Sequence, residues 1–244
     1  GLNRIRQHCD AEIWTDPLPP PYAVLRQKVA NCDGLVSLLT DKIDSALMDA
    51  AARLRVVSNF AVGFNNIDIP AATERGIAVG NTPGVLTDAT ADMAFCLLIA
   101  AARRVVEGHQ YTLAGKWKTW EPLGHLGQDL VGRTLGIVGL GGIGAEMARL
   151  GNGIGLKVLA YNRTPKPGTV PLDELLAKAD IVSLHLGLND QTRGFLNRER
   201  IAKTKPGVIV INTARAGVVD EPALLAALKS GHVGHYATDV FGKE

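Results

Sequence analysis

The sequence is poor in cysteine and in aromatic residues, and it has no long apolar run. Its 244 residues include three cysteines, Cys9, Cys32 and Cys96, and 5% aromatic residues. An odd number of widely spaced cysteines suggests neither a disulfide framework nor a zinc site, and it favours a reducing compartment. The longest apolar run, around residues 94–102, is too short to cross a bilayer, and the first twenty residues contain no signal-peptide core. We therefore expect a cytoplasmic protein with no metal and no membrane partner.

The chain also lacks an excess of charge of either sign. Lysine and arginine number 26, aspartate and glutamate 24, and the formal net charge is +2. This balance gives no reason to expect a nucleic-acid partner. Hydrophobic residues make up 46% of the chain and charged residues 20%, which is close to globular averages and excludes a disordered or collagen-like protein. At about 150 residues per domain, the chain is long enough for one large domain or two modest ones.

Short runs typical of β-strands alternate with segments of helical length and spacing along most of the chain. In the first part, strands are expected at residues 11–14, 34–38, 54–58 and 76–79, and helices at 22–30, 45–52 and 69–75. In the second part, strands are expected at 134–138, 157–161, 181–186, 208–212 and 236–240, and helices at 142–154, 172–178, 197–203 and 221–230. Because helices join successive strands, both parts predict parallel sheets, and the second predicts a doubly wound domain.

Two segments of different character lie between these parts. Residues 87–110 are rich in alanine and leucine, contain no proline and have Gly108 as their only glycine. They predict one long helix, capped by Thr87 or Asp88. Residues 112–131 contain several glycines and two tryptophans and show no steady period, so they predict an extended arm.

Gly139, Gly141 and Gly144 form a G-x-G-x-x-G pattern between a predicted strand and a predicted helix. In dinucleotide sites the first glycine permits a tight turn, the second lets backbone approach the pyrophosphate, and the third allows the helix to pack on the strand. The alternative is a purely structural turn, but the strand, the helix and the βα units that follow favour the cofactor. The residues expected to bind it here are Gly139, Leu140, Gly141, Gly142, Ile143 and Gly144.

The residues after the next predicted strand bear on the choice between NAD and NADP. An NAD site places Asp or Glu there, about 20 residues on, to bind the ribose 2′-hydroxyl. This chain has Asn162, Arg163 and Thr164 instead. No carboxylate would repel a 2′-phosphate, Arg163 can pair with it, and Thr164 can hydrogen-bond to it. We therefore expect NADP in preference to NAD, and the alternative for Arg163 is a solvated surface arginine.

Five segments, the glycine loop among them, carry motifs in a fixed order, and the similarity that they indicate covers essentially the whole chain. They are SNFAVGFNNID at residues 58–68, NTPGVLT at 81–87, the glycine loop, INTARAGVVD at 211–220 and TDVFGKE at 238–244. Together they resemble the D-isomer-specific 2-hydroxyacid dehydrogenase family, and within it the glyoxylate/hydroxypyruvate reductases. The resemblance implies two doubly wound parallel-sheet α/β domains: an incomplete flavodoxin-like substrate domain at residues 1–82 and a Rossmann dinucleotide-binding domain at 83–244.

The resemblance also implies how a 2-oxo acid is held. Arg215 matches the family's catalytic arginine, whose guanidinium can hold the substrate carboxylate and polarise the adjacent carbonyl. In the family, backbone amides that map onto Val62 and Gly63 bind the same carboxylate, and Gly63 lets the substrate come close. Taken alone, Arg215 could cap a helix or lie on the surface. Its place after an apolar strand favours a ligand site, because ligands of open α/β sheets bind beyond the carboxyl ends of the strands.

A proton donor is needed for the alkoxide that hydride transfer creates. In the family this is a histidine with a glutamate hydrogen-bonded to it, and Glu244 matches that glutamate. The histidine would follow in a Pro-His-Ile-Gly type segment, and none of the six histidines here lies in that context, so we name no catalytic histidine. Either the sequence is a piece of a longer chain, which the family's missing N-terminal strand and C-terminal helix favour, or the protein lacks this acid.

Several remaining residues receive expected roles from the same resemblance. Thr213 and Ala214 are expected to line the nicotinamide, Asp239 to accept from its carboxamide, and Thr87 to bind the cofactor. The alternative for Asp239 is a cap of the final turn. The irregular arm embraces a second subunit in many members of the family, which implies a homodimer with Trp120 near the partner's substrate cleft, whereas the alternative is a core position for the tryptophans.

The leading hypothesis is an oxidoreductase that transfers hydride from NADPH to a small 2-oxo acid, glyoxylate or hydroxypyruvate, in a cleft between the two domains, and so forms a D-2-hydroxy acid. An NAD-linked enzyme of the same family, such as a phosphoglycerate dehydrogenase, is the alternative within this class. A second alternative, from another class, is a non-catalytic protein that senses dinucleotides by closing around them.

Overall fold

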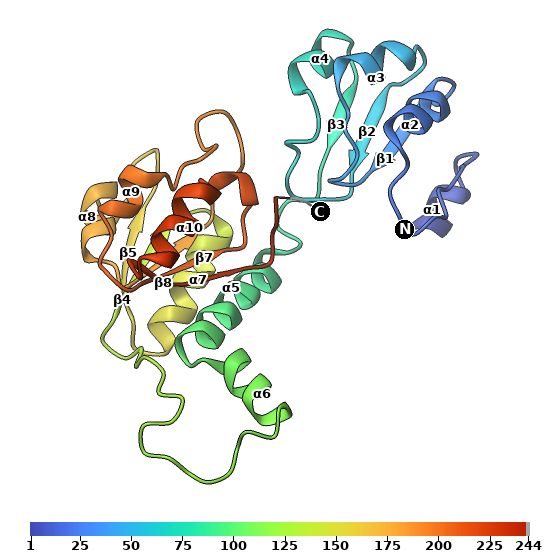
Figure 1. Cartoon of the computed structure of the whole chain (residues 1–244). Helices are drawn as coiled ribbons and strands as arrows, with labels where there is room; N and C mark the ends of the chain where they lie inside the picture. Colours follow the sequence, from blue (N-terminus) through green and yellow to red (C-terminus); the bar gives the residue numbers. More distant parts are fainter. Residues whose placement is uncertain (243–244) are drawn as a thin grey trace. The chain divides into compact units, whose positions relative to one another are not determined.

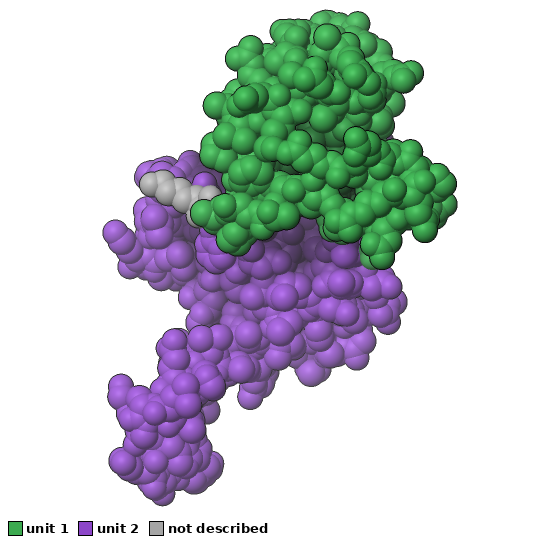
Figure 2. All heavy atoms as spheres, turned by 90° about the vertical axis from the view of Figure 1, so that its right-hand side faces the viewer, with its two compact units in different colours: residues 1–85 green, residues 86–244 purple. Residues whose placement is uncertain are grey.

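A computed structural model describes residues 1–242 of the protein. The chain forms two compact units, Gly1–Val85 and Leu86–Glu244, which are green and purple in Figure 2. Each unit contains a parallel β-sheet with helices packed against it (Figure 1). The predicted α/β fold with parallel sheets is therefore confirmed. Within residues 1–242, no helix has the length and hydropathy that a membrane span requires.

Unit 1 contains a three-stranded parallel sheet with the strand order β1-β2-β3. Its strands are β1 (Gly34–Ser37), β2 (Val56–Asn59) and β3 (Ala78–Gly80), and its helices are α1 (Leu2–Arg6), α2 (Tyr22–Val29), α3 (Ser45–Ala50) and α4 (Ile69–Glu74). Apolar side chains of α2, α3 and α4 pack with Val57 of the middle strand into one core. Because the strands are parallel, the loops that follow them leave from the same edge of the sheet.

The strand predicted at residues 11–14 is wrong, because this segment is irregular. The indole Nε1 of Trp14 donates to the carbonyl of Leu18 at 2.7 Å, and the amide of Leu18 donates to the Asp16 carboxylate at 3.2 Å. The segment thus closes on itself in a local turn. Four prolines among residues 17–21 also lack the amide that sheet pairing needs.

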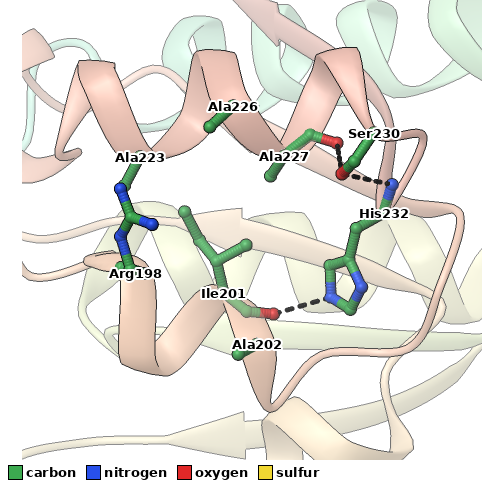
Figure 3. Close-up of a pocket in the computed structure, with 8 residues that line it drawn as sticks. All are labelled: Arg198, Ile201, Ala202, Ala223, Ala226, Ala227, Ser230 and His232. Atoms are coloured by element: carbon green, nitrogen blue, oxygen red, sulfur yellow. Dashed lines mark hydrogen bonds between the residues drawn. The ribbon is translucent and has the colours of Figure 1, made fainter.

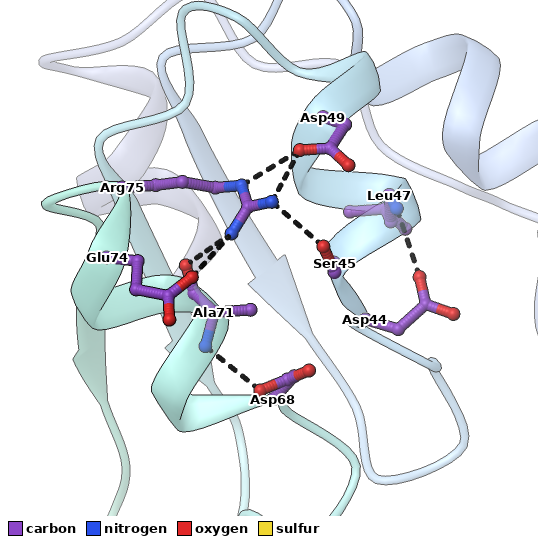
Figure 4. A network of polar contacts seen from close by, with 8 residues as sticks. All are labelled: Asp44, Ser45, Leu47, Asp49, Asp68, Ala71, Glu74 and Arg75. Carbon is purple, nitrogen blue, oxygen red and sulfur yellow. Dashed lines mark hydrogen bonds and ion pairs between the residues drawn. The ribbon is translucent and has the colours of Figure 1, made fainter.

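Aspartates begin two helices of unit 1 (Figure 4). The carboxylate of Asp44 accepts from the amide of Leu47 at 3.0 Å, and that of Asp68 accepts from the amide of Ala71 at 3.0 Å. Each satisfies an amide that the first turn of a helix leaves unbonded, which is worth about 1 kcal/mol.

Arg75, at the end of α4, joins that helix to α3 (Figure 4). Its guanidinium donates to the Asp49 carboxylate at 2.6 and 3.0 Å, to the Ser45 hydroxyl at 2.8 Å and to the carbonyl of Ala71 at 2.9 Å. The last of these bonds satisfies a carbonyl near the C-terminal end of α4, where the helix itself supplies no amide.

Unit 2 contains a five-stranded parallel sheet with the strand order β5-β4-β6-β7-β8. Its strands are β4 (Thr134–Val138), β5 (Lys157–Tyr161), β6 (Ile181–Leu184), β7 (Val208–Asn212) and β8 (Val233–Thr238). Its helices are α5 (Thr87–Ala102), α6 (Val105–Leu113), α7 (Gly142–Gly153), α8 (Leu172–Lys178), α9 (Arg198–Ala202), the 3-10 turn η1 (Ala216–Val218) and α10 (Glu221–Lys229). The strand that follows β4 in the chain, β5, lies on one side of it, and the next strand, β6, lies on the other side. The strand order therefore reverses at β4, and open α/β sheets bind ligands beside such a topological switch point.

The strands of unit 2 explain why its sheet is covered on both faces. Every residue of β7 is buried. Val208 and Val210 belong to a core with side chains of α8, α9 and α10, whereas Ile209 and Ile211 belong to a second core with α5 and α7. Because successive side chains of a strand point to opposite faces, a continuous apolar run suits a strand with helices on both sides.

The single helix predicted at residues 87–110 is wrong, because this segment contains two helices, α5 and α6. They are separated at Arg104, whose φ of 54° lies in the left-handed region. The amide of Gln128 donates to the carbonyl of Ala102 at 2.7 Å, so the returning arm takes an acceptor that a continuous helix would use itself. The Arg104 guanidinium also bonds to Glu107 at 2.5 Å, which places an ion pair in the first turn of α6.

A few element ends also differ from the prediction. Strand β6 ends two residues earlier than expected, and β8 begins three residues earlier. Leu86 is the N-cap of α5, without a side-chain hydrogen bond, in place of the expected Thr87 or Asp88.

Candidate cofactor and substrate sites

The three glycines after β4 occupy positions with different steric demands. Gly139 has a φ of 103°, and a Cβ there would lie 2.4 Å from the carbonyl oxygen of His185. A Cβ at Gly144 would lie 2.1 Å from the carbonyl oxygen of Gly139. These two positions therefore exclude a side chain. A Cβ at Gly141 would meet nothing within 4 Å, so the backbone there faces open space, as the approach of a pyrophosphate requires.

The N-terminus of α7 completes this loop. The helix begins at Gly142, and its N-cap residue, Gly141, has no side chain with which to cap it. Its first amides and its dipole therefore favour an anion at this position. Thr87 lies alongside, since a Cβ at Gly142 would be 3.5 Å from its Cγ2 and 3.6 Å from its Oγ1. The structure thus brings Thr87 to the predicted loop residues, which include Leu140 and Ile143.

Asn162 connects the end of β5 to the glycine loop. Its Oδ1 accepts from the amide of Leu140 at 3.2 Å, and its Nδ2 donates to the carbonyl of Thr164 at 2.8 Å. The next residue, Arg163, is exposed, and its guanidinium donates to the side-chain oxygen of Gln191 at 2.6 Å. Its partner is neutral, so the hydrogen bond leaves the positive charge of Arg163 uncompensated.

Sequence reasoning missed Lys166. Its Nζ donates to the carbonyl of Leu140 in the glycine loop at 2.6 Å. A local turn holds its backbone, because the hydroxyl of Thr169 accepts from the Lys166 amide at 3.0 Å and donates to the Lys166 carbonyl at 2.7 Å. A second cation therefore lies beside the glycine loop, and the available signal was a basic residue three positions after Arg163.

A buried asparagine shapes the turn that carries Arg215. Asn212, at the end of β7, is fully buried. Its Oδ1 accepts from the amide of Ala214 at 3.0 Å, and its Nδ2 donates to the carbonyl of Arg215 at 3.0 Å. The Arg215 guanidinium donates to the carbonyl of Ala214 at 2.7 Å. The arginine thus lies beyond the carboxyl end of an interior strand, in a turn whose backbone is held by Asn212.

Thr213 and Asp239 lie near the same end of the sheet. The hydroxyl of Thr213 is buried and has no hydrogen-bond partner among residues 1–242. Leaving such a group unpaired costs about 1–3 kcal/mol, so a polar group of a bound ligand would find a partner here. Asp239 is exposed and follows Thr238, whose hydroxyl donates to the carbonyl of Asn212 at 2.7 Å. Glu244, the predicted partner of the proton donor, lies outside the described residues.

Val62 and Gly63 lie in the loop after β2 of unit 1, and both are half-buried. Within residues 1–242, the backbone amides of these two residues have no acceptor. The carbonyls of Val62 and Gly63, in contrast, accept hydrogen bonds from side-chain amides of unit 1. The loop therefore offers donors, rather than acceptors, to a ligand.

His185, at the end of β6, packs against the glycine loop. Burial lowers the pKa of its imidazole to about 4, and its Nε2 lies 2.9 Å from the hydroxyl of Ser183. The ring is therefore uncharged near neutral pH. It keeps one N–H for hydrogen bonding but cannot act as a general acid there. Its backbone carbonyl is the group that requires glycine at position 139.

A shallow depression of unit 2 contains none of the predicted site residues. It has a volume of about 400 Å³ and is lined by Arg198, Ile201, Ala202, Ala223, Ala226, Ala227, Ser230 and His232 (Figure 3). The Nε2 of His232 lies 2.8 Å from the carbonyl of Ile201 and 3.1 Å from the hydroxyl of Thr204. This histidine therefore ties α9 to the segment after α10. In the described part of the chain, no group of three or more His, Cys, Asp or Glu residues is placed to hold a metal ion.

Comparison with protein families gives two matches that together span the chain. The D-isomer specific 2-hydroxyacid dehydrogenase, catalytic domain, matches residues 1–164. The D-isomer specific 2-hydroxyacid dehydrogenase, NAD binding domain, matches residues 95–244.

Similar individual proteins include glyoxylate reductases. The glyoxylate reductase of Korarchaeum cryptofilum is 47% identical over 253 residues, which cover 100% of this chain and 76% of that protein. That of Thermococcus litoralis is 45% identical over 256 residues, with 100% and 77% covered. Among solved structures, a protein of Thermus thermophilus has a TM-score of 0.94 at 45% identity, covering 100% of this chain and 79% of that one. A glyoxylate reductase from Paecilomyes thermophila has a TM-score of 0.82 at 36% identity, covering 91% and 72%.

Proposed function

The chain belongs to the D-isomer specific 2-hydroxyacid dehydrogenase family, and we propose that it uses NADPH to reduce glyoxylate or hydroxypyruvate to the D-2-hydroxy acid. Reduction of a 2-oxo acid with a nicotinamide cofactor is the activity of this family and of the glyoxylate reductases that the chain resembles. The choice of NADPH and of these two substrates is the proposal. The single observation that carries the cofactor choice is the pair of cations after β5, where an NAD site would have a carboxylate.

NADPH recognition is assigned to the turn after β5. A 2′-phosphate carries about two negative charges and needs charge-assisted hydrogen bonds. Arg163 has a guanidinium whose partner is a neutral amide, and Lys166 is held at the glycine loop. Thr164 adds a hydroxyl, and Asn162 fixes the distance between this turn and the loop. Gly139, Gly141 and the residues 142–144 would hold the pyrophosphate.

Arg215 and the amides of Val62 and Gly63 are proposed to hold the substrate. The bound nicotinamide dinucleotide supplies the hydride. We assign binding of the substrate carboxylate to the two amides of unit 1. To the Arg215 guanidinium of unit 2 we assign the binding of the 2-oxo acid and the stabilisation of the negative charge that grows on its carbonyl oxygen. Thr213, Ala214 and Asp239 would orient the nicotinamide, and Glu244 would polarise the proton donor.

Loss of absorbance at 340 nm tests this proposal. Protein expressed from the complete reading frame is mixed with glyoxylate or hydroxypyruvate, each with NADPH or NADH. We expect rapid oxidation of NADPH and at least tenfold lower kcat/KM with NADH, which corresponds to about 1.4 kcal/mol. Equal rates with both cofactors would contradict the NADPH assignment, and tight NADPH binding without turnover of either substrate would contradict the substrate assignment.

We also propose a homodimer, because the arm of unit 2 exposes large apolar side chains. The alternative core position of the tryptophans does not fit, since the exposed fraction is 58% for Trp117 and 73% for Trp120. Leu113, Leu123 and Leu126 are similarly exposed. Apolar surface concentrated on one segment is typical of a protein interface, and a second copy of the chain would cover it.

A further inference from the structure

Three consecutive carbonyls of the loop after β2 each accept a hydrogen bond from elsewhere in unit 1. The bonds run from the amide of Thr82 to Ala61 O at 2.9 Å, from Nδ2 of Asn81 to Val62 O at 2.8 Å, and from Nδ2 of Asn59 to Gly63 O at 2.8 Å. Two of the three donors are asparagine side chains. One ends β2 and the other follows β3 directly.

Because the peptide bond is planar, a hydrogen bond to a carbonyl also fixes the direction of the amide N–H of the next residue. In a trans peptide, the carbonyl of one residue and the N–H of the next point in opposite directions. A bond to Ala61 O therefore directs the Val62 amide away from Thr82, and a bond to Val62 O directs the Gly63 amide away from Asn81. Successive backbone amides that face one side of a turn can bind an anion.

The two asparagines are held to different degrees. Asn59 is fully buried, and its Oδ1 accepts from the hydroxyl of Ser37 at 2.9 Å. Its Nδ2 also donates to Oδ1 of Asn66 at 3.2 Å. The Nδ2 of Asn66 donates in turn to the carbonyls of Leu38 and Asp41, each at 3.0 Å. Asn81, in contrast, is exposed. A single exposed hydrogen bond adds little to stability, so the bond of Asn81 matters chiefly for the direction of one peptide.

We propose that Asn81 is a positioning residue, which fixes the Val62–Gly63 peptide so that the Gly63 amide faces the substrate carboxylate. The inference rests on the proposed function only in taking that carboxylate as the ligand of this loop. Asn81 itself does not touch the substrate. Because the carboxylate does not react, its binding is equal in the ground state and the transition state, and losing part of it raises KM without lowering kcat.

The test is Asn81→Ala in the complete protein, with Asn3→Ala, an exposed asparagine of α1, as the matched control. Oxalate, which presents carboxylate oxygens as a 2-oxo acid does, is titrated by calorimetry into the protein saturated with NADP. We expect its Kd to rise about tenfold in Asn81→Ala, the loss of roughly one charge-assisted hydrogen bond. The KM for glyoxylate rises similarly, while kcat, the Kd for NADPH and the melting temperature stay near wild type. Asn81→Gln, which keeps an amide donor, should recover part of the loss.

The outcomes separate this inference from the proposed function. Unchanged oxalate affinity in Asn81→Ala overturns the inference even if glyoxylate is reduced. A loss confined to kcat, or shared by NADPH binding, also overturns it, because it indicates a general structural role. The wild type could reduce neither substrate and still bind oxalate more tightly than Asn81→Ala does. That result would support the role of Asn81 and would contradict the proposed substrates. If the wild type does not bind oxalate at all, the loop is not a carboxylate site.

Discussion

Arg163 and Lys166 serve one proposed purpose but are held in different ways. Arg163 bonds to the neutral Gln191, so its charge stays available to a phosphate. Lys166 already donates to the Leu140 carbonyl, and a phosphate would have to share its ammonium. A guanidinium also matches the geometry of phosphate oxygens better than an ammonium does. We therefore assign the larger part of NADPH preference to Arg163.

Replacing Arg163 by alanine should weaken NADPH binding about tenfold to a hundredfold, which corresponds to about 1.5–3 kcal/mol for a charge-assisted hydrogen bond. The affinity for NADH should change less than threefold, because NADH has no phosphate at this position. Fluorescence titration of both cofactors measures the two effects. Arg198→Ala, an exposed arginine of the same unit, is the control. An equal loss for NADPH and NADH would rule out phosphate recognition.

A residue that follows one strand can restrict the loop that follows the neighbouring strand, and His185 is an example. It follows β6 directly, and its backbone forces glycine into the loop after β4. Because burial lowers its pKa to about 4, against about 6.5 in the unfolded chain, the unfolded state binds more protons between these values. The contribution of His185 to the free energy of unfolding is therefore fully present above pH 6.5, and it is lost as the pH drops toward 4.

Between pH 7 and pH 5, this histidine alone should remove about 2 kcal/mol from the free energy of unfolding. In His185→Gln, that part of the pH dependence should vanish, although the variant starts from a lower stability. Urea unfolding at both pH values provides the comparison. An identical pH dependence in the two proteins would mean that the imidazole is protonated as easily in the folded state as in the unfolded one.

Arg75 links α3 to α4 through several hydrogen bonds. Arg75 donates to a carboxylate, a hydroxyl and a helix carbonyl, and its side chain is 28% exposed. Among residues 1–242, Arg53 bonds to Asp33 alone, and both side chains are more than half exposed. Arg75→Ala should lower the free energy of unfolding of unit 1 by about 1–2 kcal/mol, and Arg53→Ala by less than about 0.5 kcal/mol. Equal effects in chemical denaturation would show that the added bonds contribute nothing.

Sequence patterns predict some helices, strands and loops of this chain well and miss others. The strands of unit 2 were predictable because their apolar runs are continuous, and because segments with the apolar spacing of helices separate them. The break at Arg104 was not, because it depends on Gln128, which is distant in sequence and returns to the end of α5. Within the site, the glycine loop was evident from spacing, whereas Lys166 required knowledge of where its side chain reaches.

At the scale of the whole molecule, the exposed arm predicts the oligomeric state. Sedimentation should give the mass of a dimer for the wild type and that of a monomer for Leu123→Glu, since Leu123 is 82% exposed and a buried charge at an interface is costly. Leu18→Glu, at a 71% exposed leucine of unit 1, should remain a dimer. A wild-type monomer at micromolar concentration would contradict the proposed interface.

We expect the chain to turn over a small 2-oxo acid through Arg215, with hydride from NADPH. The most direct measurement is kcat/KM for glyoxylate with NADPH in the wild type and in Arg215→Ala, together with the Kd for NADPH in both. We predict a loss of at least about a hundredfold in kcat/KM, as for other donors that stabilise a developing oxyanion, with the Kd for NADPH changed less than threefold. An Arg215→Ala variant that keeps wild-type turnover would show that Arg215 does not stabilise the transition state.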